Sequence, residues 1–198
     1  MEKDREEHLM KLGITAIAIG VAVILIGMFS ITRAFISGYN SIVDLQENTK
    51  LAKSLVETQI QARLNLIPDL VETVQSYSKH EEKVFSDIAN ARTALTKSLD
   101  TDDMNKISEA DLNVGIQIQQ LEQFVVENYP TLAASELYMT LMDEMTAAVN
   151  KITTAKVYYN EAVIKYNKKV KTFPGNILAK MYGFEEIEKI ENLSYADF

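Results

Sequence analysis

The chain has 198 residues, 47% of them hydrophobic, and a formal net charge of −8. This length accommodates one membrane segment and one domain of about 150 residues. The acidic balance argues against binding to the phosphate backbone of nucleic acids, so we expect no nucleic-acid partner. The sequence contains no cysteine, which excludes disulfides and thiolate chemistry but fits either side of a membrane.

Residues 12–32 contain no charged side chain. A helix of this length covers about 32 Å, close to the hydrocarbon core of a bilayer. A cleaved signal peptide is the rival interpretation, but its apolar region is usually only about 7–15 residues long. The preceding residues 1–11 are mixed in charge, unlike a signal peptide. We therefore predict an N-terminal flank over residues 1–11 and one uncleaved transmembrane helix over residues 12–32.

Basic residues suggest the orientation of this span. Lys3, Arg5 and Lys11 precede it, whereas Arg33 is the only basic residue between its end and Lys50. The positive-inside rule then places the N-terminus in the cytoplasm and the large domain outside. Four lysines within residues 165–171 argue for the opposite orientation if they fold back to the membrane.

Three glycines recur every seven residues within the span, at Gly13, Gly20 and Gly27. On a helix this spacing forms a narrow face, drifting by about 20° per heptad, where two backbones can approach closely. The alternative is that glycine is simply more frequent in membrane helices. We treat the three as a candidate transmembrane packing face.

From residue 36 onward, apolar side chains recur at steps of three and four, which predicts helix almost throughout. Pro68 favours a tight turn over residues 64–67, and a single kinked helix is the alternative. A polar break follows over residues 100–103, and the third helix ends at residues 128–130. The fourth helix covers about residues 131–171 and is stopped by Pro174.

Short connections between long helices favour antiparallel neighbours. The predicted fold is therefore all-α: one N-terminal transmembrane helix and then an antiparallel up-down bundle of about four long helices, over residues 36–184. Residues 173–184 form a short amphipathic segment that either caps the bundle or lies on the bilayer surface. We expect the acidic tail, residues 185–198, to be mobile.

Several motifs carry a resemblance to a known family. The central one is Arg63 to Val74, with Leu66-Ile67-Pro68 inside it, followed by Tyr77-Ser-Lys-His-Glu81 and by Ala91-Arg92. Two others are Tyr39-Asn40 and residues 159–167, which lead into residues 173–180. Together they resemble the LemA family of bacterial membrane-anchored helical proteins, from about residue 39 to 184. The resemblance implies an architecture and a bacterial cell membrane location, but no activity, because that family has no agreed biochemical role.

Three charged residues of that resemblance, Arg63, Glu81 and Arg92, fall where a bundle needs apolar side chains. We call them the polar seam, between the first two bundle helices. One interpretation is an internal ion-pair network, because an unpaired buried charge costs about 3–5 kcal/mol. The other is a polar groove for a peptide or ligand. Lys156 stands where the family commonly has arginine, which puts any network through that position in doubt.

Tyrosine-asparagine pairs form a second candidate, an interaction stripe. Two pairs lie one heptad apart, Tyr159-Asn160 and Tyr166-Asn167, and a third is Tyr39-Asn40. Tyrosine packs its ring and needs a partner for its hydroxyl, while asparagine can bridge backbone groups. The pairs therefore fit either packing at the edge of the core or a surface for a partner.

Motifs for catalysis are missing. The sequence has two histidines, and neither completes the paired Glu-x-x-His motifs of a di-iron bundle or the His-Glu-x-x-His pattern of zinc proteases. We predict no enzyme activity, no metal and no cofactor. The leading interpretation is a single-pass assembly or interaction protein of the bacterial cell envelope, with the lipid bilayer, copies of itself or other membrane proteins as partners. The alternative is a peptide- or ligand-binding module that uses the polar seam.

Overall fold

The computed structural model describes residues 2–77 and 81–191. This part of the chain is helical and contains no strand. Its helices are α1 (Glu2–Gln75), α2 (Glu82–Ser98), α3 (Met104–Asn128), α4 (Pro130–Ala133), α5 (Glu136–Lys171) and α6 (Gly175–Tyr182). They are divided between two compact units. The first contains residues up to 44 together with 169–185, and the second contains residues 45–168 together with those from 186 onward.

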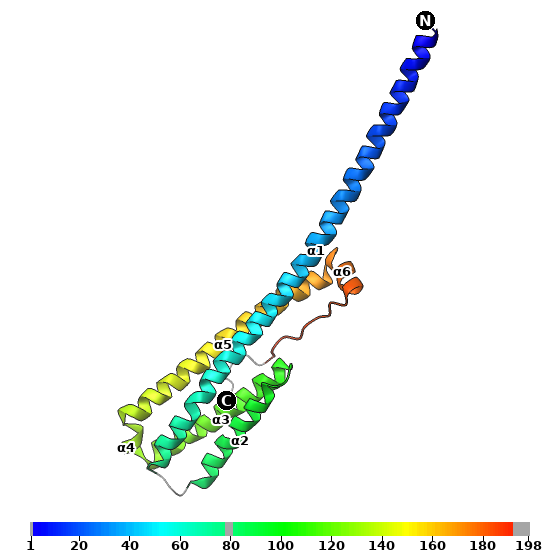
Figure 1. Cartoon of the computed structure of the whole chain (residues 1–198). Helices are drawn as coiled ribbons and strands as arrows, with labels where there is room; N and C mark the ends of the chain where they lie inside the picture. The colour runs from blue at the N-terminus through cyan, green and yellow to red at the C-terminus, as the bar shows by residue number, and fades with distance from the viewer. Residues whose placement is uncertain (1, 78–80, 192–198) are drawn as a thin grey trace. The chain divides into compact units, whose positions relative to one another are not determined.

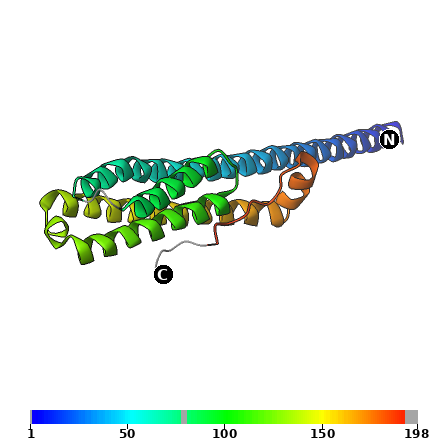
Figure 2. The same ribbon diagram turned by 90° about the horizontal axis from the view of Figure 1, so that it is seen from below.

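The second unit is a bundle in which α1, α2, α3 and α5 alternate in direction (Figures 1 and 2). Its core consists of the apolar stripes that recur at steps of three and four along these helices. Examples from the four helices are Val56, Ile60, Ile88, Leu95, Val114, Leu121, Met145 and Ile152. The predicted antiparallel bundle of four long helices is therefore confirmed.

The turn that we predicted over residues 64–67 is wrong. Helix α1 continues without interruption to Gln75 and contains Pro68 in its interior. Proline lacks the N–H that would bond the carbonyl of residue 64, so this helical turn loses one hydrogen bond. Leu64, Ile67 and Leu70 are each at most 2% exposed, and their burial in the core outweighs that loss. The first bundle helix instead ends at Gln75, and the next begins at Glu82.

The later breaks agree better with the sequence. Asp103 caps α3, because its side chain accepts hydrogen bonds from the N–H groups of Asn105 and Lys106 at 3.0 and 3.1 Å. Helix α3 ends at Asn128 as expected. Pro130 begins the four-residue α4, so that the last long helix starts at Glu136 instead of about residue 131.

The first unit contains the apolar part of α1. This is a candidate membrane span by length and composition, since its best window has a mean hydropathy of 2.6 and none of that window is buried. Its large side chains are all exposed: Ile14, Ile17, Ile19, Val21, Val23, Ile24, Leu25, Ile26, Met28, Phe29 and Ile31.

Helix α6 packs against α1 within this unit (Figure 1). A Cβ atom at Gly38 would lie only 2.7 Å from Leu178 Cδ1, so a larger residue at this position would require the Leu178 side chain to shift. Next to it, the Tyr39 ring packs edge-on against Tyr182, with centroids 4.8 Å apart, and lies 5.7 Å from the ring of Phe184. Ile177 and Met181 remain exposed on α6.

Candidate functional site

Three charged residues from three helices meet inside the bundle. Arg63 of α1 donates through Nη1 to Asp111 Oδ1 at 2.8 Å and to the Asp111 carbonyl oxygen at 3.2 Å. Lys156 of α5 donates from Nζ to Asp111 Oδ2 at 3.0 Å. All three side chains are at most 1% exposed. We call them the buried triad; its carboxylate on α3 connects α1 with α5.

The buried triad replaces the network that we expected in the polar seam. Of the seam residues, only Arg63 is buried, whereas Glu81 is half-buried and Arg92 is exposed. No ion pair joins Glu81 or Arg92 to another residue that the structure describes. The expectation failed because α1 extends past residue 67, so that Glu81 precedes α2 as its N-cap residue. Lys156 is a member of the buried triad, although the family commonly has arginine at this position.

Sequence reasoning missed Asp111. On α3 the buried positions Ile107, Asp111, Val114 and Ile118 follow steps of four, three and four, so that Asp111 lies on the core stripe of this helix. A carboxylate on such a stripe is the signal that could have identified it, because a buried charge requires a partner.

A second polar arrangement lies on the outside of the bundle, where the chain runs extended over α5 after α6. Asn167 donates from Nδ2 to the carbonyl oxygen of Ile187 at 2.7 Å, and its Oδ1 accepts from the Ile187 N–H at 3.0 Å. Asn160 makes the same pair of bonds with Ile190, both at 2.8 Å. Each side-chain amide therefore satisfies both backbone polar groups of one residue.

Asn105 of α3 continues this pattern. Its Nδ2 donates to the carbonyl oxygen of Lys189 at 3.2 Å, and its Oδ1 accepts from the Glu191 N–H at 3.0 Å. We call Asn105, Asn160 and Asn167 the asparagine ladder, and residues 187–191 the docked segment. The expected mobility of the acidic tail is therefore wrong for residues 187–191; the rest of that tail, residues 192–198, lies outside the described residues.

Helix geometry explains the register of the ladder. Asn160 and Asn167 are seven residues apart, which is about 10.5 Å along a helix. Ile187 and Ile190 are three residues apart, which is about 10–11 Å along an extended chain. Two asparagines one heptad apart thus match every third residue of an extended segment that runs opposite to α5.

The docked segment also has apolar anchors. Ile190 is 2% exposed, and Ile187 packs partly buried against the core. The Tyr159 hydroxyl donates to the carbonyl oxygen of Glu188 at 3.4 Å. Burial raises the pKa of this hydroxyl, and the negative charge of Glu188 adds to the effect. Because all of these hydrogen bonds are to backbone groups of the docked segment, the ladder recognises an extended backbone, and the positions of Ile187 and Ile190 add a requirement for apolar side chains.

The residues of the interaction stripe belong to two different units of the structure. Tyr159, Asn160, Tyr166 and Asn167 lie together on α5, with both tyrosines buried and both asparagines in the ladder. Tyr39 belongs to the other unit, where it packs against Tyr182, and Asn40 is exposed. Heptad spacing located two of the three ladder asparagines, Asn160 and Asn167; nothing in the sequence pointed to Asn105 or to the docked segment.

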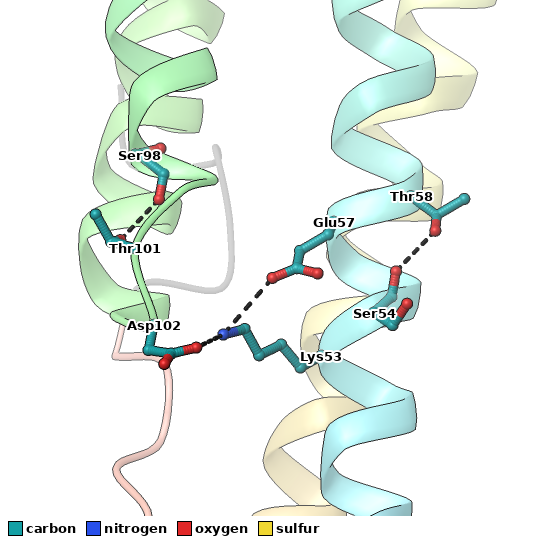
Figure 3. A network of polar contacts seen from close by, with 7 residues as sticks. All are labelled: Lys53, Ser54, Glu57, Thr58, Ser98, Thr101 and Asp102. Atoms are coloured by element: carbon teal, nitrogen blue, oxygen red, sulfur yellow. Dashed lines mark hydrogen bonds and ion pairs between the residues drawn. The ribbon is translucent and has the colours of Figure 1, made fainter.

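A third polar group joins α1 to the loop between α2 and α3 (Figure 3). Lys53 Nζ lies 2.6 Å from Asp102 Oδ1 and 3.7 Å from Glu57 Oε1. The hydrogen bond from Lys53, followed by its charge, lowers the pKa of the Asp102 carboxyl. Asp102 is fully exposed, and surface ion pairs of this kind contribute little to stability.

Other candidate chemistry is sparse in the described part of the chain. No cluster of three or more histidine or acidic side chains there has a metal-binding arrangement. A Cβ atom added at Gly13, Gly20 or Gly27 would meet no other atom within 4 Å, so that face of α1 is open.

Comparison with known proteins gives a consistent family. The LemA family model matches residues 52–196. Magnetosome protein MamQ 2 of Paramagnetospirillum magneticum is 27% identical over 80% of this chain and 66% of its own. MamQ of Magnetospirillum gryphiswaldense is 21% identical over 92% and 75%. Protein LemA of Metamycoplasma hominis is 24% identical over 85% and 78%. The chain thus spans slightly less than two thirds of the first of these relatives.

Proposed function

The chain belongs to the LemA family, and we propose that it acts without catalysis as a membrane-anchored assembly or interaction protein of the bacterial cell envelope. The observation that carries this proposal is the asparagine ladder, in which three side-chain amides hold the backbone of an extended segment. Binding of polypeptide is what this arrangement can do chemically. The relatives named MamQ and LemA support a membrane setting, and none of their names specifies a reaction.

The proposed membrane arrangement follows the charge pattern. Residues 1–11 form a cytoplasmic flank, residues 12–32 cross the bilayer, and the bundle over residues 36–184 lies outside together with the tail, residues 185–198. The exposed apolar surface of α1 supports this placement, because so many large apolar side chains are otherwise costly in water. The excess of Lys3, Arg5 and Lys11 before the span supports the orientation.

Self-association through the membrane span is part of the proposal. Gly13, Gly20 and Gly27 leave open space on α1, so a second apolar helix can approach its backbone closely there. The polar seam is not supported as a ligand groove, because Arg63 is enclosed by Asp111 and Arg92 is exposed elsewhere.

Crosslinking in intact membranes tests the proposed function. An amine-reactive reagent, followed by mass spectrometry, should join the chain to further copies of itself or to other membrane proteins. Suitable lysines are exposed along the bundle, for example Lys50 and Lys83. Recovery of the monomer alone, with no crosslinked partner at native expression, would contradict the proposal.

A further inference from the structure

We propose that the asparagine ladder is an exchangeable peptide site, which residues 187–191 of the same chain fill at rest and the same residues of a second copy fill in the assembled state. This inference rests on the proposed function, since it names both the surface and the partner of the assembly. The ligand is an extended polypeptide with apolar residues three apart, here Ile187 and Ile190.

The contacts of the docked segment favour a second copy as the occupant. All of the ladder's bonds to residues 187–191 are to backbone atoms, and Ile190 fills the one fully buried anchor position. An identical segment from another copy makes the same contacts, so the hydrogen bonds and apolar contacts at the ladder are the same before and after the exchange. Other polypeptides must supply both an extended backbone and the correctly spaced apolar residues.

The docked segment joins the hydrophobic core through Ile190, with Ile187 packed against it, and its other residues are held only at the surface. Glu188, Lys189 and Glu191 are exposed, and Ile190 alone is buried within it. Segments with few buried apolar contacts open at a small fraction of the free energy of global unfolding. The ladder can therefore release the segment while the bundle stays folded.

Membrane anchoring supplies the proximity that exchange requires. The docked segment follows α6, which ends at Tyr182, after four residues of irregular chain. Five extended steps, from Tyr182 to Ile187, span at most about 17 Å. A second bundle must therefore lie alongside, and confinement of both copies to one membrane raises their effective concentration.

Cysteine crosslinking tests the exchange, because the chain has no cysteine of its own. Glu109 on α3 and Glu191 in the docked segment are both exposed and line the same pocket beside Asn105. Two differently tagged full-length chains, one with Glu109→Cys and the other with Glu191→Cys, are expressed together and treated in membranes with a short thiol crosslinker. We expect an intermolecular product that carries both tags.

Matched controls define the result. A single chain with both substitutions should give an intramolecular product, which reports that the two positions are within reach. Adding Asn160→Ala and Asn167→Ala to the Glu109→Cys chain should reduce the intermolecular product at least about fivefold, the effect of losing roughly 1 kcal/mol of binding. Circular dichroism of this variant verifies that the bundle remains folded. Adding Ile190→Asp to the Glu191→Cys chain should reduce the product similarly, without altering the ladder.

Two outcomes would overturn the inference. An intramolecular product without any intermolecular one means that the segment stays on its own bundle. An intermolecular product of the same yield with and without the ladder substitutions means that the copies meet elsewhere. If the amine-reactive reagent still joins copies in either case, the proposed assembly role survives and only the exchange fails.

Discussion

Asp111 on α3 and Lys156 on α5 face each other inside the bundle, with Oδ2 and Nζ 3.0 Å apart. Arg63 of α1 lies 2.8 Å from the other carboxylate oxygen. The carboxylate thus connects three helices at one level, and any sliding of one helix along another would separate these charges. Buried ion pairs often add little net stability compared with apolar residues, but removing one member is strongly destabilising.

The buried triad gives the first prediction. Asp111→Ala should lower the free energy of unfolding by about 3–5 kcal/mol, because it leaves two cations enclosed without their carboxylate. Urea denaturation of the full-length protein in detergent measures this. The combined change Arg63→Met, Asp111→Leu and Lys156→Met should recover most of the loss, since apolar side chains of similar volume suit the interior. Glu81→Ala is the matched control and should change stability by under about 0.5 kcal/mol, because Glu81 is half-buried and has no ion pair with a described residue.

The second prediction concerns the asparagine ladder. Asn160→Ala removes two hydrogen bonds to Ile190, and it should increase the hydrogen-exchange rate of the Ile190 amide about tenfold or more, the equivalent of about 1.4 kcal/mol. Mass-spectrometric exchange over residues 184–191 measures this. Asn90→Ala, at an exposed position of α2, should leave that rate unchanged. Equal protection in both variants would show that apolar contacts alone hold the docked segment.

The third prediction is a pH dependence at Tyr138. Burial, followed by the negative charge of Glu122, raises the pKa of this tyrosine to about 12. Because the folded-state pKa lies above the unfolded value, ionisation favours the unfolded state: stability is unaffected by this group below about pH 10, and it is lost as pH rises through the unfolded pKa toward 12. Tyr138→Phe should therefore lose less stability than the wild type between pH 9 and 12.

At neutral pH the same substitution has a second effect. The Tyr138 hydroxyl is buried and makes no hydrogen bond to any residue that the structure describes. Tyr138→Phe should consequently raise the free energy of unfolding by about 1 kcal/mol. Tyr158→Phe, which alters an exposed ring on the same helix, is the control in both thermal and urea denaturation. A destabilised Tyr138→Phe protein would mean that the hydroxyl has a partner in solution.

Membrane topology is the fourth prediction. Single cysteines at Glu2 and at Asp102 should label oppositely with an impermeant thiol reagent in intact cells, because the positive-inside rule places residue 102 outside. Both should label after the cells are permeabilised, which controls for reactivity. Labelling of the Glu2→Cys chain alone in intact cells would reverse the proposed orientation.

The glycine face gives the fifth prediction. If copies associate through Gly20, then Gly20→Ile should weaken detergent-resistant oligomers at least about fivefold while membrane insertion is retained, because the branched side chain fills the space where the helices approach. Ala18→Ile adds similar bulk on the opposite side of α1 and should leave the oligomers intact. Sedimentation in detergent distinguishes the two. Identical oligomers in both variants would reduce the glycine spacing to coincidence.

Local sequence signals were sufficient for the helical class, the long apolar segment and most helix ends. These features depend on apolar spacing, on the charge-free run over residues 12–32, and on polar or proline residues such as Asp103 and Pro130 that act within one turn. The family was also evident from short motifs, and the family model over residues 52–196 confirms it. The heptad spacing of Asn160 and Asn167, two members of the asparagine ladder, could also be seen in the sequence.

Which residues meet became clear only from the packed bundle. Pro68 is a local signal for a turn, yet the burial of Leu64, Ile67 and Leu70 keeps α1 helical through it. The partner of Arg63 is Asp111, 48 positions away in the chain, and the occupant of the asparagine ladder is a segment that composition predicted to be mobile. Spacing along one helix fixes the face on which a side chain lies. Its partner across the bundle depends on the relative register of the helices, and that register is set by the packing of all four together.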